Sequence, residues 1–139
     1  TALKWPRMMV ATDALPAVDL RVKTNPNVAG TFSRVLGHYV RDTGLLTLSD
    51  GLARMSLYQA QWLSQSSSSF DKKGRIQLGA DADIVIFDPI KVQANAAYGD
   101  PYQPPSGIPY VVVAGQIVVK NSVVVAGVYP GKRILGDTK

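Results

Sequence analysis

Cysteine is absent from this sequence of 139 residues, and histidine occurs only once. The lack of cysteine excludes disulfide bonds, thiolate zinc sites and cysteine nucleophiles. A single histidine excludes a multi-histidine metal site made by this chain alone. No apolar run reaches the roughly 18 residues that a membrane-spanning helix needs, and the N-terminus lacks the apolar core of a signal peptide. We therefore expect a soluble protein of the cytoplasm or the periplasm, without a membrane partner.

Charged residues are also few, at 18% of the sequence. Lysine and arginine outnumber aspartate and glutamate by 15 to 10, and the resulting net charge of +5 raises the question of nucleic-acid binding. The basic residues are scattered, however, and no aromatic residues alternate with them as a base-stacking surface would require. We expect no nucleic-acid partner.

The hydrophobic pattern of the first half predicts a strand followed by a loop of unusual length. Residues 8–12 (MMVAT) are a short apolar run typical of a buried strand. A polar, proline-containing stretch leads from Asp13 to Asn27, and loops longer than about 12 residues tend to be functional or disordered. A buried strand of this kind needs neighbouring strands, so we expect the rest of its sheet to lie outside this sequence.

Helices are predicted after this loop. Apolar residues recur at helical spacing over residues 28–42. Thr47 and Asp50 form a capping pattern that starts a second helix. Ser56 is placed to cap a third short helix over residues 57–64.

The second half predicts a small antiparallel β unit. Composition changes after the serine-rich break at residues 65–69. Runs rich in β-branched residues then follow, separated by turn residues, at positions 84–87, 110–114, 117–120 and 123–126. The dipeptides Ala114-Gly115 and Asn121-Ser122 are typical of hairpin turns.

Several sequence blocks are distinctive: VATDALP at residues 10–16, GTFSRVLGHY at 30–39, GRIQLGADAD at 74–83, and the group DPYQ, YVVVAG and PGKR between residues 100 and 133. Together they resemble the C-terminal part of the amidohydrolase superfamily, and above all its N-acyl-D-amino-acid deacylase (D-aminoacylase) branch. The GRIQLGADAD block resembles the superfamily as a whole. The GTFSRVLGHY block and the last group resemble the deacylase branch more specifically.

This resemblance implies a (β/α)8 barrel enzyme that carries a small β-sandwich built from both chain ends. Residues 1–65 would form the last barrel strand, its active-site loop and helices, and residues 66–139 the C-terminal part of the sandwich. A complete barrel needs about 250 residues. We therefore expect an incomplete α/β plus β fold and a fragment of a longer zinc-dependent amidohydrolase, inactive alone. Its expected partners are the missing N-terminal part of the same enzyme, or a second copy meeting it through exposed barrel surface.

Asp13 is the candidate catalytic residue. It follows the predicted strand, at the position where barrel enzymes place catalytic groups. The resemblance implies that this aspartate contacts the zinc ion, takes a proton from the attacking water and returns it to the departing amine of an N-acyl amino acid. From the residues alone, a cap on the turn that leads to Pro16 is the simpler explanation of Asp13.

The resemblance also implies that the long loop binds the substrate. In the deacylases this loop ends in His-Pro-Arg, and the arginine binds the substrate carboxylate; the matching residues here are Asn25, Pro26 and Asn27. Asparagine cannot form the charged fork that arginine forms with a carboxylate. Asn27 and the loop cations Arg21 and Lys23 are the candidate substrate-binding residues, and the two cations are as well explained as solvated loop charges.

Other polar and aromatic side chains are expected to be structural. His38 lies inside a predicted helix, and Asp83 is expected to fix a turn by accepting backbone N–H groups. Trp5 and Trp62 are expected in the core. Two alternatives stay open: a cyclic-amide or ureide hydrolase of the same superfamily (dihydroorotase- or hydantoinase-like), and a non-catalytic β-rich binding module.

Overall fold

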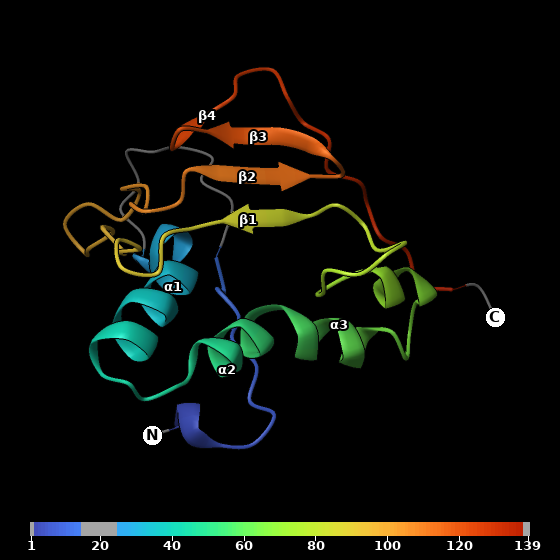
Figure 1. Cartoon of the computed structure of the whole chain (residues 1–139), viewed down its shortest axis with the longest axis horizontal. Coiled ribbons are helices and arrows are strands. Elements are labelled where there is room, and N and C mark those ends of the chain that lie inside the picture. Colours follow the sequence, from blue (N-terminus) through green and yellow to red (C-terminus); the bar gives the residue numbers. More distant parts are fainter. Residues whose placement is uncertain (1, 15–24, 138–139) are drawn as a thin grey trace.

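The computed structural model of the chain describes residues 2–14 and 25–137. Within these ranges a helical layer lies beneath a four-stranded antiparallel sheet (Figure 1). After the last strand the chain returns to the helical layer and comes close to the 3-10 turn Ser68–Lys72 (Figure 1). In the described part of the chain, no helix combines the length and the apolar character needed to cross a membrane.

The helical layer consists of two continuous helical stretches. The first joins α1 (Asn27–Arg34) to a π-helical segment, Val35–Asp42. The second joins α2 (Leu48–Leu52) through the π-helical segment Ala53–Leu57 to α3 (Tyr58–Leu63). Single 3-10 turns, Ala2–Lys4 and Ser68–Lys72, lie before and after this layer. The helix predicted over residues 28–42 is therefore confirmed.

The predicted helix break at Ser56 is wrong. Ser56 lies within the second helical stretch, where its hydroxyl donates to the Leu52 carbonyl at 2.8 Å. A serine inside a helix satisfies its hydroxyl on the carbonyl of the preceding turn, so this residue type does not force a new helix start. The predicted start at Thr47 is confirmed, because Thr47 Oγ1 accepts the Asp50 N–H at 3.1 Å.

Residues 8–12, predicted as a strand, form no β-strand in the structure. Side chains of the helical layer instead donate to alternate carbonyls of this segment: Arg54 to Met8 at 3.1 Å, Gln59 to Val10 at 2.9 Å and Asn27 to Thr12 at 2.6 Å. Alternation is typical of an extended chain, whose successive carbonyls point to opposite sides. The strand does not form because no other strand pairs with the segment within the described ranges.

The sheet has the simplest possible order, β1-β2-β3-β4, and each strand is antiparallel to the next. The strands are β1 (Ile84–Ile86), β2 (Tyr110–Val113), β3 (Gln116–Lys120) and β4 (Val123–Val124). Tight turns join β2 to β3 and β3 to β4, and their corner residues have positive φ: Ala114 47°, Gly115 78°, Asn121 52° and Ser122 64°. These angles match the turn type that suits hairpin twist. The predicted hairpins are confirmed.

The helical layer and the sheet region meet around Val92, in the proline-rich connection between β1 and β2. The Val92 side chain is fully buried, with 0% of its surface exposed. Arg41, from the first helical stretch, donates to the carbonyls of Ile90 and Val92 and to Gln93 Oε1. A Cβ at Gly37 would lie 2.7 Å from the Val92 carbonyl oxygen, so only glycine allows this close approach.

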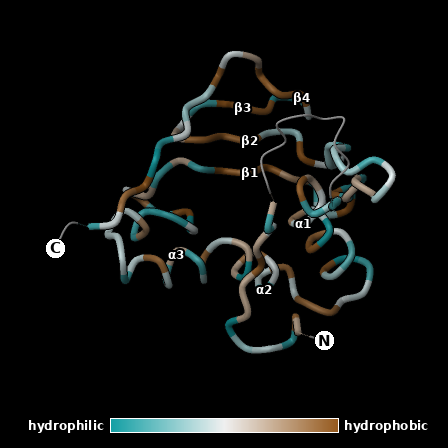
Figure 2. Tube along the Cα trace, turned by 180° about the vertical axis from the view of Figure 1, so that it is seen from behind, coloured by the Kyte–Doolittle hydropathy of each residue, from teal (hydrophilic) through white to brown (hydrophobic). Residues whose placement is uncertain are grey.

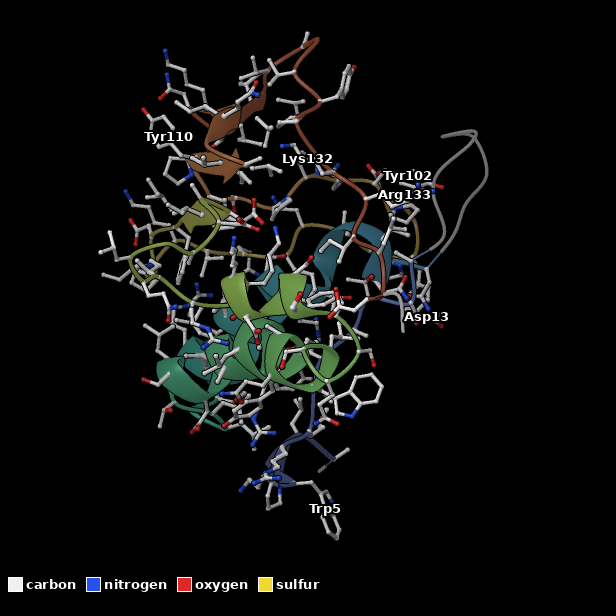
Figure 3. The ribbon with its side chains drawn as sticks, turned by 90° about the vertical axis from the view of Figure 1, so that its right-hand side faces the viewer. Trp5, Asp13, Tyr102, Tyr110, Lys132 and Arg133 are labelled. Atoms are coloured by element: carbon white, nitrogen blue, oxygen red, sulfur yellow. The ribbon has the colours of Figure 1, made fainter. Side chains whose placement is uncertain are left out.

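The tryptophans predicted for the core are exposed, Trp5 by 72% and Trp62 by 62%. Trp5 projects from the end of the molecule opposite the sheet (Figure 3). The buried core of the helical layer is small and built around aliphatic residues, with Val10, Val35 and Leu46 at its centre. Hydrophobic residues instead run along β1, β2 and β3 (Figure 2).

Candidate functional site

Asp13 lies at the end of the 8–12 segment, with an exposed side chain and a φ of 48°. Positive φ is uncommon outside glycine, and aspartate is among the residues that tolerate it best. The Ala14 N–H donates to Thr12 Oγ1 at 3.4 Å, so Thr12 rather than Asp13 caps this corner. Among the residues that the structure describes, nothing hydrogen-bonds the Asp13 carboxylate. The carboxylate is thus presented at the surface, at the margin of the molecule in Figure 3.

Asn27 is brought next to Asp13 through the backbone of Thr12. Its Nδ2 donates to the Thr12 carbonyl at 2.6 Å, across a separation of 15 positions. The Asn27 N–H also donates to Asn25 Oδ1 at 3.3 Å, and its carbonyl accepts from Thr31 Oγ1 at 2.9 Å. The two ends of the long loop are therefore joined at its base. The candidate residues Arg21 and Lys23 lie outside the described residues.

The sequence analysis missed the side chains that hold the segment before Asp13. Arg54 binds the carbonyls of Trp5 and Met8, and Gln59 binds that of Val10. These contacts span 46 to 49 positions, and no local pattern indicates them. Their effect is to fix the course of the chain that leads to the carboxylate.

The described residues do not fit a complete metal site. Within residues 2–14 and 25–137, no three His, Cys, Asp or Glu side chains come together as metal ligands. Catalytic zinc takes three protein ligands. His38 does not join Asp13, because it lies on the first helical stretch with Nδ1 4.0 Å from Asp42 Oδ2. Asp13 would therefore supply one ligand at most.

A second polar cluster joins the start of β1 to the β2–β3 hairpin. Lys73 Nζ pairs with Asp83 and lies 2.9 Å from Asp81 Oδ2. Asp83 Oδ1 accepts the N–H of Ala114 at 2.8 Å. The prediction that Asp83 accepts a backbone N–H is confirmed, but the donor belongs to the hairpin rather than to the turn before β1, because the antiparallel pairing brings the two ends together.

Both ionisable partners in this cluster have shifted pKa values. The pKa of Asp83 is lowered, first because the Ala114 N–H donates to its charged form and then because of Lys73. The pKa of Lys73 is raised by its hydrogen bonds to Asp83 and Asp81. Each shift favours the charged form. Lys73, Asp81 and Asp83 therefore form a cluster of charges, named the charged clip, that stabilises the sheet region.

A hollow of about 980 Å³ opens between this clip and the C-terminal tail. Its walls come from three parts of the sequence: Ser69 and Lys73 with residues 80–83, residues 113–115, and residues 131–137. Lys132 and Arg133 belong to the tail wall (Figure 3). Because the walls are distant in sequence, no motif predicted this hollow.

Comparison with known proteins gives matches over most of the chain. A family model described as "Amidohydrolase family" matches residues 9–119. The D-aminoacylase of Alcaligenes xylosoxydans xylosoxydans is 36% identical over 107 residues, which are 77% of this chain and 20% of that protein. An N-acyl-D-glutamate deacylase of the same organism matches to the same extent. The chain thus spans about a fifth of the length of the curated relatives it matches.

Solved structures give the same result. A D-aminoacylase described as defining a novel subset of amidohydrolases matches with a TM-score of 0.72 and 33% identity, over 85% of this chain and 23% of that one. The N-acyl-D-glutamate deacylase of Bordetella bronchiseptica, complexed with zinc and a phosphonate inhibitor, matches with a TM-score of 0.71 and 38% identity, over 79% and 22% of the two chains. Deacylase relatives favour the resemblance stated above over the cyclic-amide alternative.

Proposed function

The chain belongs to the amidohydrolase family, and on that premise we propose that it is the C-terminal part of a zinc-dependent enzyme that hydrolyses the amide bond of N-acyl-D-amino acids. The observation that carries the proposal is the placement of Asp13. The family match begins at residue 9, and the exposed carboxylate follows directly on a segment whose backbone is held from the helical layer. The names of the relatives support the substrate class.

Asp13 acts first as a base and then as an acid. Its carboxylate takes a proton from water as the water oxygen bonds to the amide carbon. When the C–N bond breaks, the same proton passes to the departing nitrogen, which leaves a carboxylic acid and a free amine. One carboxyl group can serve both steps, and such acid–base catalysis contributes typically about 10²- to 10⁴-fold to the rate.

Zinc, when bound, polarises the amide carbonyl and lowers the pKa of water. The zinc complex of the Bordetella bronchiseptica relative supports this cofactor. Since the described residues gather no set of three ligands, most of the ligands come from the rest of the enzyme. This chain's own contribution is the carboxylate of Asp13 and the backbone that presents it.

The N-terminal part of the same enzyme is the proposed partner. The side of the 8–12 segment that presents the backbone groups of Met9 and Ala11 has no backbone partner among the described residues, and it is suited to pairing with a further strand. Apolar strand residues are also uncovered, with Val85 exposed by 53%, Val123 by 66% and Val124 by 74%. Burying such surface is favourable, so the chain alone is expected to be inactive and to associate.

The test is a chimera in which the matched segment of the Alcaligenes D-aminoacylase is replaced by that of this chain. We expect the chimera to release amine from an N-acetyl-D-amino acid, and this chain alone, supplied with zinc, to release none. Asp13→Asn in the chimera should lower the rate about 10²- to 10⁴-fold. The control Asp71→Asn changes an exposed aspartate in the 3-10 turn Ser68–Lys72 and should leave the rate unchanged. Full activity of the Asp13→Asn chimera would refute the role of Asp13, and hydrolysis by the chain alone would refute its dependence on a partner.

A further inference from the structure

We propose that Asn27 is a positioning residue for Asp13, which acts by holding the peptide group between Thr12 and Asp13, and that it does not bind the substrate carboxylate. This inference rests on the proposed function, because it assigns a role within the same site. It departs from the expectation raised by the sequence, in which Asn27 stands where the deacylases have a substrate-binding arginine.

The contacts of Asn27 tie its side chain to the protein backbone. Nδ2 donates to the Thr12 carbonyl at 2.6 Å, in a part-buried position. The backbone N–H and carbonyl of Asn27 are also used, by Asn25 Oδ1 and by Thr31 Oγ1. The amide carries two N–H groups, and the one that donates to the Thr12 carbonyl fixes the direction of the side chain. The geometry therefore favours a structural use of the amide over recognition of a ligand.

The bonded carbonyl is the one that matters for Asp13. The Thr12 carbonyl and the Asp13 N–H belong to one planar peptide group, so fixing the carbonyl fixes the plane from which the Asp13 side chain projects. Asp13 has a φ of 48°, in the left-handed region that is disfavoured for residues other than glycine. Without the Asn27 bond, the left-handed conformation of Asp13 is less strongly stabilised. A change of φ would redirect the carboxylate.

The same kind of contact, a side chain that donates to a backbone carbonyl, recurs along residues 8–12, and this supports a positioning role for Asn27. Arg54 holds the Met8 carbonyl, Gln59 that of Val10, and Asn27 that of Thr12. Asn27 is the last of the three and the one nearest to the carboxylate. Displacing a reacting group by about 1 Å can lower the rate about 10²-fold, so the last anchor is expected to have the greatest effect on catalysis.

The experiment compares Asn27→Asp with Asn25→Asp in the full-length enzyme that contains this chain. Asn27→Asp removes the donor and places a carboxylate against the Thr12 carbonyl. Asn25→Asp adds the same negative charge two positions away and keeps the oxygen that accepts the Asn27 N–H. We expect Asn27→Asp to lower kcat about 10- to 100-fold with KM changed less than about threefold. The Asn25→Asp control should leave both constants near the original values.

Two further variants make the result decisive. Asn27→Ala removes the donor without adding charge and should reproduce the loss in kcat. Asn27→Gln keeps an amide donor on a longer side chain and should retain part of the kcat that Asn27→Ala loses. It also provides a test if Asn27→Asp and Asn27→Ala fail to fold. A rise in KM with unchanged kcat would overturn the inference in favour of substrate binding, and unchanged kinetics would overturn it outright. If Asp13→Asn retained activity, the proposed function would fail instead.

Discussion

In the sheet region, β2, β3 and β4 hydrogen-bond to their neighbours in sequence through tight turns, whereas alternate carbonyls of residues 8–12 are bound by side chains from the helical layer. The β2–β3–β4 hairpins satisfy their backbone locally. The 8–12 segment depends on contacts that span 15 to 49 positions. The candidate site is therefore sensitive to substitutions far away in the sequence, because the carboxylate of Asp13 lies at the end of the segment that depends on distant side chains.

The two regions are coupled at the connection between β1 and β2. Val92 is fully buried there, and Arg41 binds carbonyls on either side of Lys91. Gly107, on the return of the same connection, has its backbone against Lys91 and Val92. Changes at this junction should therefore affect both regions together, whereas changes within one region should have smaller and separable effects.

The largest effect is expected from Gly107→Ala. The residue has a φ of 77°, and a Cβ there would lie 2.5 Å from the Lys91 carbonyl carbon and from the Val92 nitrogen. Left-handed φ costs an alanine roughly 1–2 kcal/mol, and overpacking adds about 1–3 kcal/mol. Calorimetric unfolding should show a total loss above about 2 kcal/mol relative to the original protein.

Gly127→Ala is the matched control for this variant. Gly127 has the same φ of 77°, but a Cβ there would meet nothing within 4 Å. It should show only the conformational cost of roughly 1–2 kcal/mol. Equal losses in the two variants would mean that the backbone of the β1–β2 connection yields freely, and the proposed coupling of the two regions would be abandoned.

A smaller effect is expected from Gln59→Met, which tests the helical region alone. Gln59 Nε2 donates to the Val10 carbonyl at 2.9 Å and to the Arg54 carbonyl at 2.6 Å. Methionine has a similar shape but no donor, and leaving a buried carbonyl unsatisfied costs about 1–3 kcal/mol. Denaturant unfolding should detect this loss. Gln61→Met, at an exposed position of α3, should be neutral; a comparable loss there would show that the contact to Val10 is not the cause.

The contrast between local contacts and contacts that are distant in sequence also explains which features the sequence could predict. The hairpins at Ala114-Gly115 and Asn121-Ser122 were predicted because turn type depends on adjacent residues. The strand predicted at residues 8–12 was wrong because strand formation needs a partner, and apolar composition does not provide one. The hydrogen bond from Asn27 to Thr12 also could not be predicted from the sequence, since it joins the two ends of a long loop. Asp13 itself was located from the motif that follows the 8–12 segment, and its catalytic role stays a prediction.

The smallest effect concerns the sheet region, where Lys73, Asp81 and Asp83 form the charged clip. The pKa of Asp83 is lowered in the folded protein. Its stabilisation is therefore present above the unfolded carboxyl pKa, about 3.9, and is lost as the pH falls through the lower folded value. The pKa of Lys73 is raised, so its stabilisation is present below the unfolded lysine pKa, about 10.4, and is lost as the pH rises through the higher folded value.

Asp83→Asn should remove the part of the pH dependence of stability that appears at low pH, with little change in structure. Asparagine keeps an oxygen for the Ala114 N–H but carries no charge for Lys73. Because these side chains are partly exposed, the loss near neutral pH should stay within about 1 kcal/mol. Urea unfolding of both proteins between neutral pH and about pH 3 should show that the difference in unfolding free energy shrinks as the pH falls through the folded Asp83 pKa. A constant difference would mean that the clip acts through the backbone hydrogen bond alone. In that case the bond from the Ala114 N–H to Asp83, which spans 31 positions, would stabilise the sheet region without help from the charge of Lys73.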